Sequence, residues 1–230
     1  MHKQRGFTLV EIAIVLVIIG LLLGGILRGQ ELIQNARVRN IIDQQNGIKA
    51  AFFGFQDRFR MIPGDLTAAQ VTQVGSGVIG ATAANSGNGQ IEAGDVAAAF
   101  QNITVTGFIS CQTCTATAAA AALPANSPVN VYGGVLQLVT DAVYAVPPAT
   151  TATVRHNVKS GNLIPSNVLY EADVKIDDGV PLSGQFRFSV WAGAATAPAA
   201  TCTNTTATPT AWETTANSVQ PNCGASTLIN

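Results

Sequence analysis

The chain is poor in histidine and in charge, and this limits the chemistry it can perform. Its 230 residues include two histidines, and only 11% of them are charged. One of the two, His156, lies in a strand-like run with no acid or nucleophile at a catalytic spacing. The sequence also has no phosphate-binding loop and no zinc motif. We therefore predict that the chain is not an enzyme.

Basic charge is scarce in the larger part of the chain. The formal net charge is −1 at pH 7. From residue 63 onward, four Lys or Arg stand against nine Asp or Glu, a difference of −5. Binding to nucleic acid requires a basic patch that replaces the counterions of the phosphates. The acidic balance argues against a nucleic-acid partner.

Proline is absent from Phe7 to Ile62, and this stretch contains the single long apolar run of the sequence. From Phe7 to Leu27 the only ionisable residue is Glu11. As a helix that rises about 1.5 Å per residue, the run spans roughly 30 Å, enough to cross a bilayer. Because Lys3 and Arg5 precede the run, we expect the first residues to remain in the cytoplasm. Everything after the run would then lie on the periplasmic side.

The residues that lead into the run form an unusual processing signal. Gly6–Glu11 reads G-F-T-L-V-E. A secretory signal is cut after its apolar region, whereas a cut after Gly6 would keep the whole span in the mature chain. An acid inside a span is rare unless it has a function.

This segment resembles the class III signal of type IV prepilins and pseudopilins, in which glycine is followed by F-T-L-x-E. The resemblance implies that a prepilin peptidase cuts between Gly6 and Phe7 and N-methylates Phe7. It also implies an assembly role for Glu11, whose carboxylate would pair with the α-ammonium of Phe7 on a neighbouring subunit. Alternatively, Glu11 lies near the membrane interface and reaches water.

The resemblance further implies a structural subunit of a type IV pilus-like filament. The precursor would sit in the inner membrane with its head in the periplasm, and then polymerise through its N-terminal helix. Its partners would be further copies of itself, the prepilin peptidase, and an assembly platform driven by a cytoplasmic ATPase. A pseudopilin of a type II secretion system, a minor pilin or adhesin, and an anchored protein that never polymerises are the alternatives.

The expected regions are a leader at residues 1–6, the transmembrane half of a long helix at 7–27, its amphipathic half at 28–62, and a head at 63–230. In the amphipathic half, residues recur at heptad spacing in two rows, which predicts one buried face. The rows are Ile41, Ile48, Phe55, Ile62 and Val38, Gln45, Phe52, Phe59. The resemblance implies an α+β pilin fold, with this helix packed on an antiparallel sheet and a disulfide-tied C-terminal region.

Glycines weaken the middle of the long helix. Gly20, Gly24, Gly25 and Gly29 each cost roughly 0.5–1 kcal/mol relative to alanine in a helix interior. Within a filament, part of this segment would extend, or the small residues would let helices pack closely. Many members of the family have a proline near the end of the span, where this chain has Arg28.

The four cysteines all fall on the expected periplasmic side, where they would be oxidised. Three pairings are possible, and we prefer Cys111–Cys114 with Cys202–Cys223. The second bond would close a loop of about 20 residues and add roughly 3 kcal/mol. A redox-active or metal-binding C-x-x-C is the alternative for the first bond.

In the head, alternation and turn residues predict a short helix, several strands and a second helix. The helices are expected at Val96–Gln101 and from Pro165-Ser166 onward. The strands are expected at Ile103–Ile109, Val131–Thr140, Ala142–Val146, Thr153–Val158 and Gly184–Trp191.

The segment Asp173–Pro181, together with Pro63–Asp65, resembles a group of larger prepilin-like proteins. Pseudopilins hold calcium in a C-terminal loop, which makes Asp177 and Asp178 candidate calcium ligands, and a solvated Asp-Gly turn is the alternative. An EF-hand-like run, Asn88–Ile91, has an alanine at its first ligand position, which cannot bind calcium. We expect no other cofactor.

Overall fold

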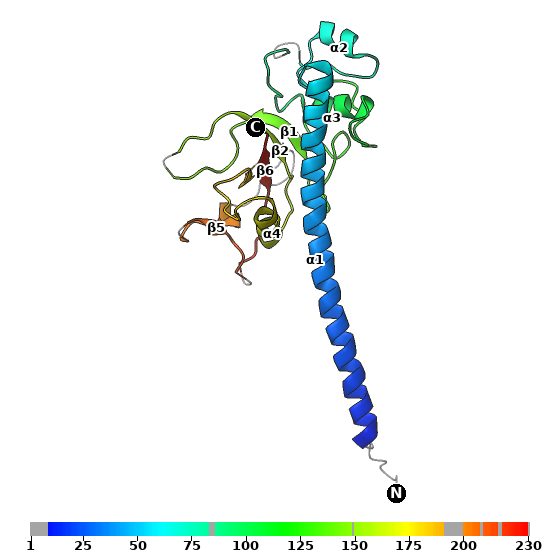
Figure 1. Cartoon of the computed structure of the whole chain (residues 1–230), viewed down its shortest axis with the longest axis vertical. Coiled ribbons are helices and arrows are strands. Elements are labelled where there is room, and N and C mark those ends of the chain that lie inside the picture. Colours follow the sequence, from blue (N-terminus) through cyan, green and yellow to red (C-terminus); the bar gives the residue numbers. More distant parts are fainter. Residues whose placement is uncertain are drawn as a thin grey trace. The chain divides into compact units, whose positions relative to one another are not determined.

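The computed structural model describes residues 9–82, 86–148, 150–190, 200–207, 209–215 and 218–229. The chain divides into two compact units, Met1–Arg37 and Val38–Asn230. A single helix, α1 (Leu9–Phe59), contributes to both units (Figure 1).

In the second unit, α1 buries one face, as the heptad rows predicted. Its buried side chains are Val38, Ile41, Gln45, Ile48, Ala51, Phe52 and Phe55. The helix ends at Phe59, before the predicted Ile62. Arg60 adopts a left-handed conformation with φ 57°, and its amide donates to the carbonyl of Gln56 at 2.8 Å. This is a common way to close a last helical turn.

The head contains a four-stranded antiparallel sheet (Figure 1). Its strands are β1 (Gln137–Asp141), β2 (Arg155–Lys159), β3 (Phe186–Phe188) and β6 (Ala225–Leu228), in the order β1-β2-β6-β3. The register places Val158 opposite Leu138 on one side and Thr227 on the other. The last strand in sequence therefore lies in the interior of the sheet, between β2 and β3.

Three short helices and a hairpin complete the described part of the head. They are α2 (Ala68–Val74), α3 (Val96–Val105), α4 (Ser166–Ile176), and the pair β4 (Thr203–Asn204) and β5 (Ala211–Trp212), preceded by a 3-10 turn η1 (Ala200–Cys202). A capping box begins α2, since Thr67 and Gln70 each bond the other's backbone amide.

Two hydrophobic clusters share α1. Phe52 and Phe55 belong to a cluster with Phe100 of α3 and Leu138 of β1. Val38 and Ile41 belong to the other cluster, which joins α4, β3, β5 and the Cys202–Cys223 pair. Because the two clusters draw on successive turns of the same helix face, α1 ties them into one head.

The predicted strand at Ile103–Ile109 is wrong. Helix α3 continues through Val105, beyond the predicted end at Gln101. Phe100 and Ile103 are fully buried and stand three residues apart, a helical spacing. The alternation from Ile103 to Ile109 therefore reflects the end of a helix followed by a turn at Gly107, whose φ is 83°.

The predicted strand at Ala142–Val146 is also wrong, because side chains take the bonds that a ladder would need. The carbonyl of Val143 accepts from Lys159 Nζ at 2.7 Å and from Ser189 Oγ at 2.6 Å. Strand β1 occupies only the end of the predicted Val131–Thr140, since a turn closes at Gly133, whose amide donates to the carbonyl of Asn130.

The remaining strand and helix predictions fall close to the observed elements. Strand β2 lies within one or two residues of the predicted Thr153–Val158, and α4 begins at Ser166 as expected. Strand β3 covers only Phe186–Phe188 of the predicted strand, whose last residue, Trp191, lies outside the described residues.

Candidate functional site

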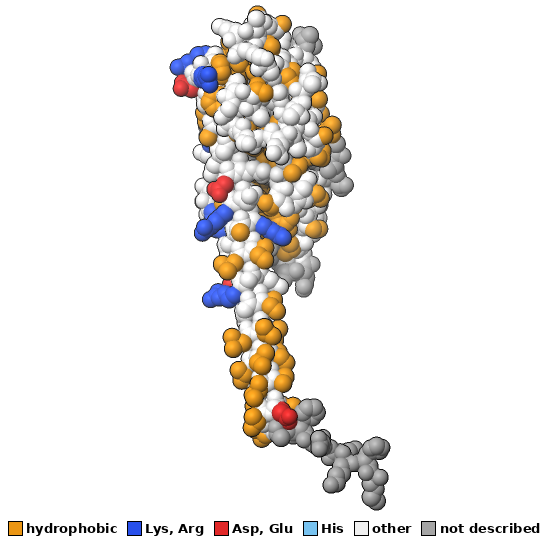
Figure 2. Space-filling view, turned by 90° about the vertical axis from the view of Figure 1, so that its right-hand side faces the viewer, with side chains coloured by type: hydrophobic (Ala, Val, Ile, Leu, Met, Phe, Trp, Pro, Cys, Tyr) orange, Lys and Arg blue, Asp and Glu red, His pale blue; other side chains and the backbone are white. Residues whose placement is uncertain are grey.

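The first unit presents an apolar helix without a core of its own. Every described side chain from Leu9 to Arg28 is exposed, and Leu9 itself is 86% exposed. Among the described residues, α1 is the one helix long and apolar enough to cross a membrane, with a mean hydropathy of 2.8 in its most apolar window. Figure 2 shows hydrophobic side chains covering this stretch of the helix.

Glu11 lies in the first turn of α1 as described. It is the only ionisable residue between Leu9 and Leu27. A carboxylate is favoured at a helix N-terminus, where unpaired amides leave a partial positive charge. The first basic residue past the span, Arg28, pairs with Glu31 at 2.9 Å in the open. Gly6 and Phe7 lie outside the described residues.

The helix glycines are not required by packing within this chain. At Gly20, Gly24, Gly25 and Gly29, a β-carbon would meet no atom of the described chain within 4 Å. The same is true of Gly47, higher on α1. Any reason for glycine at these places must therefore come from outside the single chain, from lipid or from another protein.

The cysteines form the two pairs that the sequence analysis preferred, Cys111–Cys114 and Cys202–Cys223. Both sulfurs of the second pair are fully buried. That pair connects η1 to the segment that leads into β6, where Ile164 and Cys223 bond each other's backbone. It therefore fixes the β4–β5 region to the sheet.

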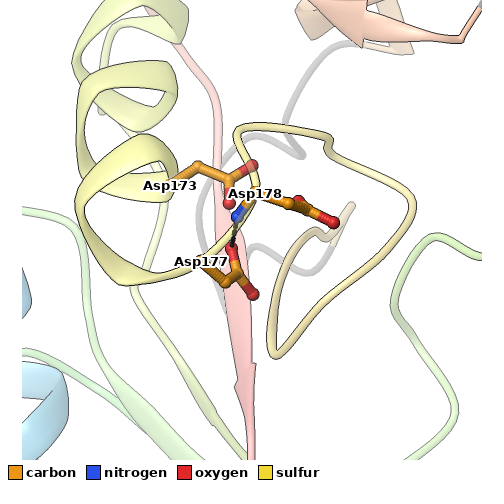
Figure 3. A group of neighbouring side chains, drawn as sticks. All are labelled: Asp173, Asp177 and Asp178. Atoms are coloured by element: carbon orange, nitrogen blue, oxygen red, sulfur yellow. Dashed lines mark hydrogen bonds between the residues drawn. The ribbon is translucent and has the colours of Figure 1, made fainter.

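Three acids converge at the end of α4 (Figure 3). Asp173, Asp177 and Asp178 each offer a carboxylate oxygen, and these oxygens lie within 4.8 Å of one another. Asp173 comes from the last turns of the helix and is fully buried, whereas Asp177 and Asp178 are exposed in the turn that follows. The geometry brings together the two acids named from sequence and a third that was not.

Burial, and after it the hydrogen bond with Asp177, raise the pKa of Asp173 to about 8. Trp212 of β5 donates through Nε1 to one carboxyl oxygen, Oδ2, at 2.6 Å. Within the described chain, no N–H or O–H donor reaches the buried Oδ1. A proton on Oδ1 resolves this, because it can donate to Asp177. Asp173 is thus a neutral acid at pH 7 that links α4, β5 and the turn.

Asp177 and Asp178 organise the turn through backbone and hydroxyl donors. Asp177 Oδ2 accepts from the amides of Gln185 and Phe186, and Oδ1 from the amide of Asp178. Burial alone would raise the pKa of Asp177, but bonds from Asp173 and these amides lower it below its ordinary value.

The other acid, Asp178, accepts from the amide of Val180 and from Ser183 Oγ. Gly184 makes room for the arrangement, since a β-carbon there would collide with the Asp177 carboxylate. All four oxygens of Asp177 and Asp178 already accept a bond from the protein. The observed geometry is that of a closed Asp-Gly turn, and a calcium ion would have to compete with these donors.

The EF-hand-like run also wraps a carboxylate of the chain itself. The amides of Gly87, Asn88 and Gly89 donate to Asp65 at 2.7, 3.2 and 2.7 Å. Asp65 lies just after the end of α1, so these charge-assisted bonds hold residues 87–89 against the segment that follows the helix. Sequence reasoning had treated Pro63–Asp65 and this loop as separate features.

His156 has a structural environment. Its Nδ1 lies 2.7 Å from Thr140 Oγ1, and its ring packs against Phe52 with 5.1 Å between centroids. Burial lowers its pKa, so the ring is neutral at pH 7. It joins β1 and β2 to α1.

The partner of Asp173 is the main element of this site that sequence reasoning missed. Trp212 lies 39 residues further along the chain, in an Ala/Thr-rich stretch for which no helix or strand was predicted. The available signal was the isolated tryptophan itself, since its large apolar ring seldom stays exposed and its N–H needs an acceptor when buried.

Comparison with known proteins places a motif at the N-terminus. Residues 1–27 match the model of the prokaryotic N-terminal methylation motif, which is the class III signal of type IV pilins and pseudopilins. No curated protein and no solved structure matches the chain. The match supports a membrane-anchored precursor of the type IV pilin or pseudopilin kind, and a structural subunit rather than an enzyme.

Proposed function

We propose that this chain is a structural subunit of a type IV pilus-like filament. The observation that supports this most strongly is the methylation motif at residues 1–27. The motif includes the apolar stretch of α1, whose described side chains from Leu9 to Arg28 are exposed on every side. Such a helix needs lipid around it before assembly and other helices around it afterwards.

Processing prepares the chain for both states. Prepilin peptidase cuts after Gly6 and methylates Phe7, so that the apolar helix remains on the mature protein with a cationic amine at its start. Lys3 and Arg5 leave with the leader, which changes the formal net charge from −1 to −3. The leader faces the cytoplasm, and the head with its two disulfides lies in the periplasm, where disulfides persist.

Glu11 provides the contact between subunits. An unpaired carboxylate among apolar helices costs several kcal/mol, and the methylated amine of Phe7 on a neighbouring copy offsets that cost. An assembly platform with a cytoplasmic ATPase extracts subunits from the membrane and adds them to the filament.

Substitution of Glu11 tests this proposal. Glu11→Ala should leave processing and membrane insertion intact and abolish sheared filaments, whereas Glu31→Ala, an acid beyond the span that pairs with Arg28, should assemble normally. Mass spectrometry of the mature N-terminus should find methyl-Phe7. Unprocessed Met1 in native material, or wild-type filament yield from Glu11→Ala, would refute the proposal.

A pseudopilin of a type II secretion system is the second candidate, because the matched motif is shared by both kinds of precursor. The two differ in where the filament lies. Deleting the chain should remove surface filaments if it is a pilin, and should block release of secreted proteins while leaving surface filaments intact if it is a pseudopilin.

A further inference from the structure

The chain contains two Asn-Gly pairs, and the structure places them in different surroundings. Asn46-Gly47 lies within helix α1. Asn88-Gly89 lies in the loop whose amides donate to Asp65. Both asparagine side chains are exposed. Because the dipeptide is the same and only its backbone differs, one pair serves as a built-in control for the other.

An asparagine that precedes a glycine can react with its own backbone. The glycine nitrogen attacks the side-chain Cγ of the asparagine, so that a C–N bond forms and the Cγ–Nδ2 bond breaks. Base takes the proton of the attacking amide, and the departing nitrogen gains a proton and leaves as ammonia. Water then opens the cyclic imide at either carbonyl, which gives aspartate or isoaspartate. Glycine permits this attack because it has no β-carbon to crowd the nitrogen.

The contacts of Asn88 favour the reaction. Its Oδ1 accepts from the amide of Gln90 at 2.8 Å, and this bond folds the side chain back over the peptide that joins Asn88 to Gly89. The same N–H group stabilises the negative charge that develops on Oδ1 when Cγ is attacked. The exposed side chain also gives water access to the imide.

The bond from Gly89 to Asp65 does not block the attacking nitrogen. Gly89 N–H donates to Asp65 Oδ2 at 2.7 Å, and an N–H bond lies in the plane of its peptide group. The Cγ atom of Asn88 approaches the nitrogen from outside that plane. A charged acceptor also polarises the N–H group that it binds, which assists the loss of the proton.

Helix α1 protects the other pair. Within a helix, the amide of Gly47 donates to the carbonyl four residues earlier, and the regular backbone holds its nitrogen away from the side chain of Asn46. Ring closure would require α1 to open at this place. Asn46 should therefore persist under conditions that convert Asn88.

We propose that Asn88 is a site of spontaneous deamidation, at which water converts the carboxamide to a carboxylate and residues 87–89 are released from Asp65. Asp65 is only 5% exposed and accepts from the amides of all three residues. An aspartate at position 88 adds a second negative charge to this contact, and like charges repel. An isoaspartate lengthens the backbone by one methylene, which displaces the amide of Gly89.

Ageing of the full chain tests the site. After incubation of the detergent-solubilised protein in warm, mildly alkaline buffer, peptide mapping by mass spectrometry should find a gain of about 1 Da at position 88. The converted fraction there should exceed that at position 46 by about tenfold or more, because α1 holds the second pair. Conversion should be faster at higher pH, since base removes the amide proton. Equal conversion at the two positions, or none at Asn88, would overturn the proposal.

Two variants separate the reaction from its consequence. Asn88→Gln should keep its mass on ageing, because its longer side chain would have to close a larger ring. Asn88→Asp copies one product, so it and the aged wild type should melt about 2 °C or more below the fresh protein, with faster amide hydrogen exchange at residues 87–89. Aged Asn88→Gln should match its fresh form. Wild type that is converted at Asn88 but keeps its melting temperature and its exchange rates would refute the release from Asp65.

Discussion

Residues 9–27 and 38–59 belong to one helix, but their apolar side chains are arranged differently. In the first stretch, the apolar side chains cover all sides and are exposed. In the second, they form a stripe that is buried against the head, with polar and charged residues opposite. A helix that is apolar all round needs apolar surroundings, whereas a striped helix supplies one wall of a core. The two stretches of one helix are thus suited to two different surroundings.

Truncating an apolar side chain to alanine should change the free energy of unfolding very differently in the two stretches. Phe55→Ala removes a fully buried ring, and we expect it to lower the free energy of unfolding of the head by about 3–5 kcal/mol. Leu16→Ala, in the exposed stretch, should leave that quantity unchanged. Thermal melts of the detergent-solubilised full chain would show this. Equal losses would mean that the span also packs on the head.

The two disulfides should contribute unequally to the stability of the head. Cys202→Ser/Cys223→Ser opens a bond with a sequence separation of 21 and should cost about 3 kcal/mol, and Cys111→Ser/Cys114→Ser about 2 kcal/mol, by loop-closure entropy. The difference would be measured by urea unfolding of both double variants. A larger loss from opening Cys111–Cys114 than from opening Cys202–Cys223 would contradict the expected order.

The pH dependence of the head should report the neutral acid in its core. The folded pKa of Asp173, about 8, lies above its ordinary value of 3.8. The neutral acid therefore makes its full contribution to the free energy of unfolding below the unfolded-state pKa. That contribution is lost as pH rises towards the folded-state pKa. Asp173→Asn mimics the neutral acid, and at pH 8 its free energy of unfolding should exceed that of wild type by several kcal/mol.

Below about pH 3 the two proteins should be equally stable, because the acid is then mostly neutral in both states. Melts from pH 3 to 9 give the comparison, and Asp57→Asn provides the control, since it alters an exposed carboxylate on α1. A stability difference that is constant across this range would contradict the assignment of a buried, neutral Asp173.

Calcium should have the smallest effect. Because the turn carboxylates already accept protein donors, we expect calcium in place of EDTA to raise the melting temperature by less than about 1 °C. A rise of several degrees that Asp178→Asn abolishes would instead establish a calcium site, and would place a metal among the elements that stabilise the head.

Sequence periodicity predicted the parts of the fold that depend on local pattern. Helix α1 was predictable because its 51 residues combine an apolar run with heptad rows and contain no proline. Helix α4 was predictable because Pro165 and the Asp177–Gly179 turn mark its two ends. Strand β6 was missed because Ala225, Ser226 and Thr227 are small or polar, which leaves Leu228 as its single large apolar residue and gives no alternation. Its burial comes from neighbours far away in sequence.

The candidate site divides along the same line. The motif at residues 1–27 is continuous, so it could be read directly from the sequence. The acidic cluster depends on Trp212, on the room left by Gly184, and on the amides of Gln185 and Phe186. These contacts arise only when β3 and β5 pack beside α4, so local sequence patterns do not predict them.

The interior position of β6 also has a consequence for biosynthesis. Strands β2 and β3 do not pair with each other, and residues 225–228 join β3 to the β1–β2 pair. During synthesis these residues emerge after every other strand of the sheet. The head therefore cannot complete its sheet until residues 225–228 have been synthesised. Until β6 pairs with them, β3 and one edge of β2 remain unpaired, and unpaired strand edges can pair with other chains.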